Sequence, residues 1–337
     1  MSVVKGIDFI MTYSPRERFF KTLKGENAGS LVCDYEPFSV LRDPISVVAG
    51  GNRQPGKEVR DVFGTTIVWP EGVPGPMPHV TDENKVLRDI CNWKNELVIP
   101  NYESLDCDWK PAQESMAAID RENKLVTVVM GTGLFERLHF LMGFEDTLVN
   151  LIVETEAVHE LLDALLEVRM THARLLIENL RPEVVIHHDD WGNKQSLFMR
   201  SDLWRELFKE RYRKLFAYLR ENGIIVVHHA DCHCADIAED MADIGVQVWQ
   251  GVIPDNDITP LQKKLGGKMT LMGGIDSVID RPDATEDEIR SEVRRVCKTY
   301  GPAGYFIPSM TYGLPGSIYP HVLDIIVDEI SRYNNGV

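Results

Sequence analysis

The sequence predicts a (β/α)8 barrel, the TIM-barrel fold, formed by a single domain over residues 1–337 with a helical extension at its N-terminus. Eight short apolar runs, typical of buried parallel strands, alternate with helical patterns or long loops. The length of 337 residues fits one large barrel, and no linker or low-complexity segment divides the chain. No Gly-x-Gly-x-x-Gly follows the first strand and no P-loop is present, which disfavours the alternative of a doubly wound open sheet.

The elements follow from local signals along the chain. Ser14 can cap a helix, with Pro15 at its first position and Glu17 completing a capping box, and this helix runs to Gly25. Apolar runs predict eight strands, at 30–35, 65–69, 124–130, 183–186, 224–227, 246–252, 269–272 and 304–308. Helical patterns predict helices at 135–142, 145–180, 201–221, 285–300 and 318–333, with another beginning near Ile237. The Pro- and Gly-rich stretch 70–78 is expected to be a long loop that covers or walls a site.

Composition and charge exclude several classes of protein. A net charge of −16 disfavours a nucleic-acid binder and docking on anionic lipid, because both need a basic face. No apolar run approaches the roughly 18 to 20 residues of a membrane span, and residues 1–13 do not form a secretory signal. Six scattered cysteines in a long chain are not a disulfide framework. We therefore expect a cytoplasmic protein.

The fifth predicted strand ends in an unusual concentration of ligand-type side chains. Residues 228–234 contain three histidines, two cysteines and an aspartate, directly after the apolar run 224–227. Imidazole and thiolate are the usual ligands of zinc, and carboxylate is an acceptable one. The spacing does not match a structural zinc module, which leaves two interpretations. One is a catalytic zinc with ligands from several strand ends, and the other is a polar turn with buried cysteines.

In a barrel, the C-terminal ends of all strands open on one mouth, where active sites are built. Ionisable and aromatic side chains recur at these predicted ends. The mouth is expected to collect Asp34, Tyr35, Trp69, His188, Asp189, Asp190, Trp191, His229, Asp231, Cys232, Cys234, Gln250, Met310 and Tyr312. Each residue alone could be a polar loop group or a helix cap. Four strand ends that carry clustered His, Asp or Cys point to a catalytic site.

Five segments along the chain form recognisable motifs. They are Arg16-Glu17-Arg18-Phe19, Asp61-Val62-Phe63-Gly64, Gly143-Phe144-Glu145-Asp146, Asp189-Asp190-Trp191-Gly192 and the strand-five segment 227–245. Together they resemble the uroporphyrinogen decarboxylase superfamily and, within it, the corrinoid-dependent methyltransferases. The resemblance covers nearly the whole chain, and the order and spacing of its motifs are more specific than any one of them.

The chain departs from this family at two places. Uroporphyrinogen decarboxylases carry an Arg-Gln-Ala-Gly-Arg-Tyr segment near the N-terminus, whereas residues 34–38 here contain acids and no base, which disfavours a polyanionic tetrapyrrole. The methyltransferases ligate zinc with His-x-Cys after strand five and a further Cys near strand eight. Here His229 matches, Asp231 or Cys232 takes the Cys position, and residues 307–311 offer no cysteine. The expected zinc ligands are His229 with Cys232 or Asp231, joined by Cys234 or by a carboxylate from the end of strand four.

The resemblance implies transfer of a methyl group from a small donor to the cobalt of a separate corrinoid protein. A methoxylated aromatic is the first candidate donor, because the aromatic side chains of the mouth could stack its ring. The expected substrate-binding residues are Asp34, Tyr35, Trp69, Trp191, Tyr312 and Met310. The expected acids for the leaving oxygen are Asp190, His188 and Asp189. The corrinoid-binding motif Asp-x-His-x-x-Gly is absent, so another chain must bring the corrinoid.

Two alternatives remain from the sequence. One is a cofactor-free decarboxylase of a carboxylated substrate, in which Asp34 is the key polar residue. The other is a non-catalytic barrel that binds a ligand.

Overall fold

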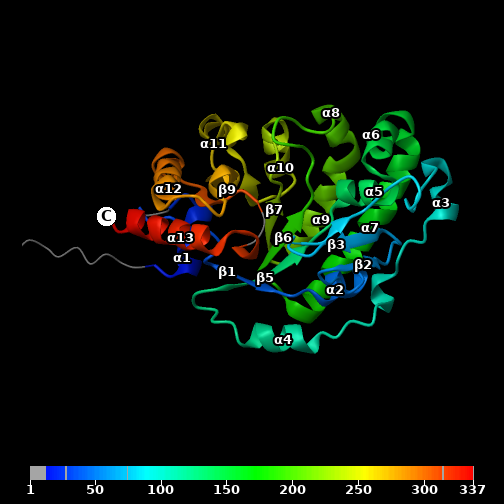
Figure 1. The fold of residues 1–337 in the computed structure, drawn as a ribbon, viewed down its shortest axis with the longest axis horizontal. Coiled ribbons are helices and arrows are strands. Elements are labelled where there is room, and N and C mark those ends of the chain that lie inside the picture. Colours follow the sequence, from blue (N-terminus) through cyan, green and yellow to red (C-terminus); the bar gives the residue numbers. More distant parts are fainter. Residues whose placement is uncertain (1–12, 27–28, 74, 313–314, 337) are drawn as a thin grey trace, which may run out of the picture.

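A curled sheet of seven parallel strands forms the centre of the computed structural model, which describes residues 13–26, 29–73, 75–312 and 315–336 (Figure 1). Its strand order is β1-β5-β6-β7-β8-β9-β10, and every neighbouring pair is parallel. The strands are β1 (Phe38–Leu41), β5 (Leu125–Met130), β6 (Val184–His188), β7 (Ile225–His229), β8 (Val248–Val252), β9 (Thr270–Ile275) and β10 (Phe306–Met310). The order follows the sequence, as in a TIM barrel, and the predicted fold class is confirmed.

Helices pack around this sheet; all but the first and the last lie between successive strands in the sequence (Figure 1). They are α1 (Pro15–Leu23), α2 (Pro44–Ala49), α3 (Trp93–Glu96), α4 (Lys110–Ala117), α5 (Leu134–Met142), α6 (Phe144–Val153), α7 (Thr155–Leu180), α8 (Ser201–Trp204), α9 (Glu210–Glu221), α10 (Ala238–Asp243), α11 (Ile258–Leu265), α12 (Glu286–Tyr300) and α13 (Pro320–Asn334). The capping boxes predicted at Ser14 and Thr285 both form. The helix predicted at 145–180 is interrupted, because Glu154 between α6 and α7 leaves the helical conformation.

The second predicted strand belongs to another sheet, so the prediction of eight barrel strands is wrong for this segment. Residues 66–69 form β3 (Thr66–Trp69), which lies between β2 (Lys57–Arg60) and β4 (Met77–Pro78) in a small antiparallel sheet. The β-branched run predicted a strand correctly, but its partners are residues on either side of it in sequence. The prediction of a long loop at 70–78 is wrong for its last two residues, because Met77–Pro78 form β4 and pair with β3.

The first predicted strand, 30–35, is also wrong, although the segment is buried as predicted. Asp34 has φ of 49°, in the left-handed region, which interrupts any extended conformation, and the first strand starts later, at Phe38. Helix α13 holds the segment through two hydrogen bonds between the Leu31 backbone and the Asn334 side chain. Within the described residues no backbone pairing joins β1 to β10, and the side chain of Ser309 on β10 instead donates a hydrogen bond to Asp34.

The interior of the curled sheet is apolar below its mouth. Alternate residues of the strands, such as Val184 and Ile186 on β6, pack against one another and against Phe19 of α1. The extension α1 thus closes the N-terminal end of the barrel with aromatic side chains, and the apolar floor leaves the opposite end for polar chemistry.

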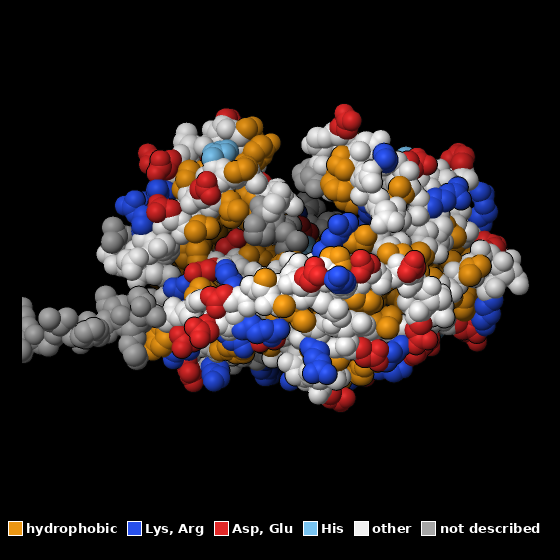
Figure 2. Space-filling view, turned by 90° about the horizontal axis from the view of Figure 1, so that it is seen from below, with side chains coloured by type: hydrophobic (Ala, Val, Ile, Leu, Met, Phe, Trp, Pro, Cys, Tyr) orange, Lys and Arg blue, Asp and Glu red, His pale blue; other side chains and the backbone are white. Residues whose placement is uncertain are grey.

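Two observations concern the membrane proteins and nucleic-acid binders that the composition disfavours. Within the described residues, no helix combines the length and the apolar character needed to cross a bilayer. Figure 2 shows a face where Lys and Arg are interspersed with Asp and Glu, and where the surface is hollowed between two raised parts. No extended basic patch lies among the described residues of that face, in agreement with the negative net charge. Residues 1–12, in which the sequence predicts no secretory signal, lie outside the described residues.

Candidate functional site

Strand alternation places two histidines at the mouth. Successive side chains of a strand point to opposite faces, so His188 shares the inner face with Val184 and Ile186 of β6. By the same alternation His229 shares the inner face of β7 with Val227. His188 and His229 are direct partners in the β6–β7 register, which brings the two imidazoles together at the last residue of each strand.

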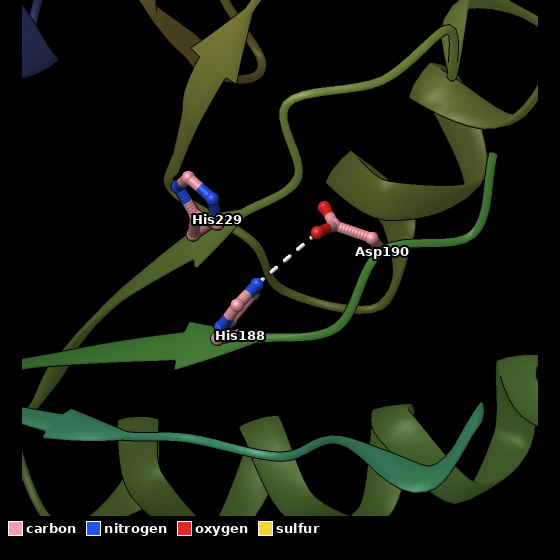
Figure 3. Close-up of side chains that lie close together, drawn as sticks. All are labelled: His188, Asp190 and His229. Atoms are coloured by element: carbon pink, nitrogen blue, oxygen red, sulfur yellow. Dashed lines mark hydrogen bonds and ion pairs between the residues drawn. The ribbon is translucent and has the colours of Figure 1, made fainter. Parts of the chain in front are cut away.

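His188, His229 and Asp190 form a group of potential metal ligands (Figure 3). One ligand atom from each residue lies within 4.8 Å of the other two. The His188 Nε2 atom lies 3.2 Å from an Asp190 carboxylate oxygen, and the two imidazole centroids are 4.6 Å apart. Asp190 comes from the loop directly after β6, so the group combines two neighbouring strand ends, as predicted for the mouth.

Gln250 on β8 orients the imidazole of His229. The Nδ1 atom of His229 donates a hydrogen bond to the Gln250 Oε1 atom, because an amide oxygen only accepts. Burial and the nearby charge of His188 lower the pKa of His229 to about 4, so the imidazole is neutral near pH 7. A neutral imidazole with Nδ1 protonated presents a free electron pair on Nε2, which is the form that binds a metal.

His188 has the opposite electrostatic environment. Partial burial disfavours its charged form, but the carboxylates of Glu136 and Asp190 outweigh burial and raise the pKa of His188 to about 10. The Glu136 carboxylate oxygen lies 3.7 Å from His188 Nε2, and burial raises the pKa of Glu136 to about 7. Conversely, the hydrogen bond from His188 outweighs burial and keeps the pKa of Asp190 below its ordinary value.

Glu136 is a residue that the sequence analysis missed. It lies in the first turn of α5, where its carboxylate accepts a hydrogen bond from the Gly133 backbone. The sequence signal was a glycine-rich break, Gly131-Thr132-Gly133, followed three residues later by a glutamate, which is a helix-capping pattern. The pattern predicted a helix start but not that the same carboxylate would approach His188.

Asp189 has a structural environment, in contrast to its neighbour Asp190. It is fully buried, and its two oxygens accept hydrogen bonds from four donors. These donors are the backbone amides of Phe135 and Glu136, the Trp191 indole and the Tyr212 hydroxyl. Its predicted catalytic role stays a prediction, and the geometry assigns it to joining the start of α5 to the loop after β6.

The two cysteines lie outside the ligand group. Cys232 and Cys234 are fully buried, with their sulfur atoms 3.3 Å apart, and burial raises the pKa of Cys234 well above its ordinary value. Asn256, which the sequence analysis also missed, holds this turn by accepting from the Cys234 amide and donating to the Cys232 carbonyl. The predicted ligand Asp231 is closer to the group, since its backbone amide donates a 3.1 Å hydrogen bond to Asp190. Metal binding by these three residues stays a prediction.

The predicted substrate-binding residues differ widely in exposure. Trp191 is fully buried, with one face stacked on His228 at a centroid distance of 4.2 Å, so it offers no exposed face to a ring. Met310 is also buried, and Trp69 lies in the antiparallel sheet with its indole donating to the Val73 carbonyl. Tyr312 is half-buried and donates to Asp280.

Asp34 and Tyr35 are both buried in the segment before β1. Burial raises the pKa of Asp34 to about 6, although the Ser309 hydrogen bond acts in the other direction. Like the other predicted substrate contacts, those of Asp34 and Tyr35 stay predictions.

The donor set of the ligand group suits zinc. Two imidazoles and one carboxylate match the three protein ligands of a catalytic zinc, with a fourth position left for water or substrate. A zinc-bound histidine is expected to keep the electron pair of one ring nitrogen for the metal and to donate a hydrogen bond from the other. In His229 these are the free Nε2 atom and the Nδ1 atom that donates to Gln250. His188 would have to release its proton to become a ligand.

The fold and site define an α/β barrel whose mouth brings together three potential metal ligands. A family model described as uroporphyrinogen decarboxylase (URO-D) matches residues 61–333, and this chain belongs to that family. The superfamily predicted from the sequence is therefore confirmed.

Solved structures give a second comparison. One similar structure is a methyltransferase from Methanosarcina mazei, with 16% identity and a TM-score of 0.69, covering 96% of this chain and 99% of that chain. Another is a xylose isomerase-like TIM barrel protein from Mycobacterium smegmatis in complex with magnesium, with 13% identity and a TM-score of 0.33, covering 68% and 80% of the two chains. No match was found among the curated proteins.

Proposed function

We propose that this protein is a methyltransferase that moves a methyl group from a small donor to the cobalt of a corrinoid held by another protein chain. The observation that carries the proposal is the His188–Asp190–His229 group at the mouth of a uroporphyrinogen-decarboxylase-type barrel. The solved structure with a TM-score of 0.69 is named a methyltransferase, which supports the same class. A methoxylated aromatic remains the first candidate donor.

The chemical requirement is stabilisation of the leaving oxygen. When the methyl group passes to cobalt, its carbon–oxygen bond breaks and the oxygen keeps the electron pair, so it needs a proton or a cation. Zinc bound by His188, Asp190 and His229 would supply a Lewis acid for this oxygen. Burial raises the pKa of Glu136 to about 7, so this carboxyl is partly protonated near neutral pH and is a candidate to protonate the oxygen.

The charge of the mouth selects against polyanionic substrates. Asp34, Glu136, Asp190 and Asp231 all belong to the segments that surround the mouth, and no arginine belongs to the ligand group. An approaching tetrapyrrole with many carboxylates would be repelled, whereas a neutral or singly charged aromatic would not.

A decarboxylase of a smaller acid is the second candidate, favoured by one observation. Asp34 is buried, hydrogen-bonded to Ser309, and has a pKa raised to about 6, so this carboxyl can hold or release a proton near neutral pH. Such an enzyme would need no metal, which separates the two candidates experimentally.

The test is spectroscopic. The purified, metal-analysed protein is mixed with cob(I)alamin and a panel of methoxylated aromatics, methanol and methylamines. Growth of methylcob(III)alamin with one donor, and its loss in His229→Ala, would support the proposal. Lack of conversion with every donor, together with lack of bound zinc, would refute it. Release of carbon dioxide from carboxylated aromatics by the same preparation would then favour the second candidate.

A further inference from the structure

A small polar cavity lies at the end of β5, and the residues that line it are outside the ligand group. Its volume is about 80 Å³, and its wall includes Arg53, Arg137, Arg169, His172, Ser46 and Thr132. These side chains come from α2 and the loop after it, from α5, from α7 and from the turn after β5. Three arginines around so small a space are unusual, because like charges repel and burial of each charge is costly.

Arg137, which lines the cavity, has a side-chain donor without a partner among the described residues. Its side chain is buried, and one terminal nitrogen forms an ion pair with Asp61 at 2.6 Å. Its Nε atom is buried and has no hydrogen-bond partner among the described residues. A buried guanidinium N–H without an acceptor costs free energy unless a group outside the chain satisfies it.

Arg169 and Arg53 have no carboxylate partner among the described residues. Buried Arg169 donates to the Gly131 carbonyl at 2.7 Å and the Tyr102 hydroxyl at 3.1 Å, and its Nη1 atom lies 3.4 Å from His172 Nδ1. Half-buried Arg53 donates to the Gly50 carbonyl at 3.1 Å. Neutral acceptors satisfy individual hydrogen bonds but leave the positive charge uncompensated.

The local charge is positive as a result. Two carboxylates stand near the cavity, Asp61 beside Arg137 and Asp43, which accepts a 2.7 Å hydrogen bond from His172. Three arginines therefore face two carboxylates. Burial lowers the pKa of Arg53; the charge of Asp61 acts in the opposite direction and the charge of Arg137 in the same direction as burial.

We infer that this cavity binds a small oxyanion, a carboxylate or an orthophosphate, between Arg53, Arg137 and Arg169. The guanidinium fork matches the paired oxygens of both chemical groups. The volume is well below the roughly 300–1,000 Å³ of pockets for drug-sized ligands, so only the anionic group itself would fit. This inference goes beyond the proposed function and does not depend on it.

The cavity is connected to the candidate site through neighbouring residues. Arg169 holds the Gly131 carbonyl at the end of β5, and two residues further on Gly133 caps α5. On α5, Arg137 lines the cavity while the adjacent Glu136 approaches His188. An anion bound by Arg137 would thus stabilise the helix turn that positions Glu136.

Binding can be measured without any assay of methyl transfer. Inorganic phosphate and acetate are titrated separately into the full-length protein by isothermal calorimetry at constant ionic strength, with chloride as the reference anion. We expect saturable binding of at least one of the two, and their relative affinities identify the source of the oxyanion. Arg53→Ala should weaken that binding by at least about tenfold, since a charge-assisted bidentate contact is lost.

Arg42→Ala is the matched control, because Arg42 is exposed, precedes α2 closely and does not line the cavity. It should bind as wild type does. Arg169→Met, checked for folding by circular dichroism, provides a second cavity variant. Absence of saturable binding of either anion, or equal weakening by Arg42→Ala and Arg53→Ala, would overturn the inference.

Discussion

His229 at the end of β7 and Gln250 on β8 are joined side chain to side chain, with the imidazole Nδ1 donating to the amide oxygen. The two residues are also direct partners in the β7–β8 register. The amide thereby fixes the tautomer of His229 and leaves its Nε2 electron pair free for a metal ion.

Loss of this hydrogen bond should weaken metal binding. For Gln250→Leu we expect roughly a 10- to 100-fold lower zinc affinity, because outer hydrogen bonds orient the ligand and raise its basicity. Competition with a chromophoric chelator measures the change. Gln247→Leu is the control, since Gln247 contacts the Val226 amide near the start of β7 rather than His229. Equal affinities in the two variants would show that Gln250 does not position a ligand.

The cysteines and the histidines can be separated by mutation. We expect Cys232→Ser/Cys234→Ser to keep stoichiometric zinc, because both thiols are buried outside the ligand group and burial raises the pKa of Cys234 well above its ordinary value. His229→Ala and Asp190→Ala should lose it. Metal analysis after dialysis measures the content of each variant. Retention of zinc by Asp190→Ala, with loss in both His229→Ala and the double serine variant, would instead support the thiolate site expected from the sequence.

The sequence predicted which strand ends form the site, but not which side chains come together there. The ends of strands carrying His188 and His229 could be predicted to meet, because apolar runs located β6 and β7 and alternation oriented their last residues. The position of Cys232 and Cys234 outside the ligand group could not be predicted, because it depends on a turn that Asn256 holds from a distant segment. The approach of Glu136 to His188 could not be predicted either, since a capping glutamate gives the same sequence pattern wherever its helix lies in the fold.

The fold, like the site, was predicted correctly where local sequence decides the structure and incorrectly where distant contacts decide it. The apolar run at 30–35 is buried as predicted, but the left-handed conformation of Asp34 ends any strand there. The run at 66–69 is a strand, but only its contacts show that it pairs with β2 and β4 instead of the barrel. Propensity and periodicity describe one segment at a time, and neither determines partners.

Asp34 should make stability depend on pH. Its pKa is about 6 in the folded protein, against the ordinary value of 3.8 for an aspartate exposed to water, so the folded state binds more protons between these values. Stability therefore falls as pH rises from about 4 to about 6, and the loss persists above pH 6. Asp34→Asn should remove this effect and be more stable than wild type at pH 8 by up to about 3 kcal/mol, with little difference at pH 4.

Urea unfolding at both pH values measures the difference, and Asn tolerates the left-handed conformation at this position. Asp202→Asn, at an exposed carboxylate in α8, is the control and should show no such pH-dependent difference. A stability difference for Asp34→Asn that is the same at pH 4 and pH 8 would contradict the raised pKa.

Truncation of Asp189 should mainly lower the stability of the protein, whereas truncation of Asp190 should mainly remove zinc. Asp189→Ala leaves four buried donors without their acceptor, including the Tyr212 hydroxyl and the Trp191 indole, so we expect a loss of about 3–5 kcal/mol in the free energy of unfolding. Asp190→Ala should cost about 1 kcal/mol, because Asp190 is only partly buried, and should remove zinc instead.

Urea unfolding and metal analysis on the same two preparations measure both quantities. The adjacent positions provide a matched pair, since each variant removes one carboxylate from the same loop. A stable Asp189→Ala protein that binds zinc but transfers no methyl group would show that Asp189 acts in catalysis, as the sequence predicted. Unfolding of that variant, with a stable but metal-free Asp190→Ala, would assign Asp189 to the structure and Asp190 to the metal site.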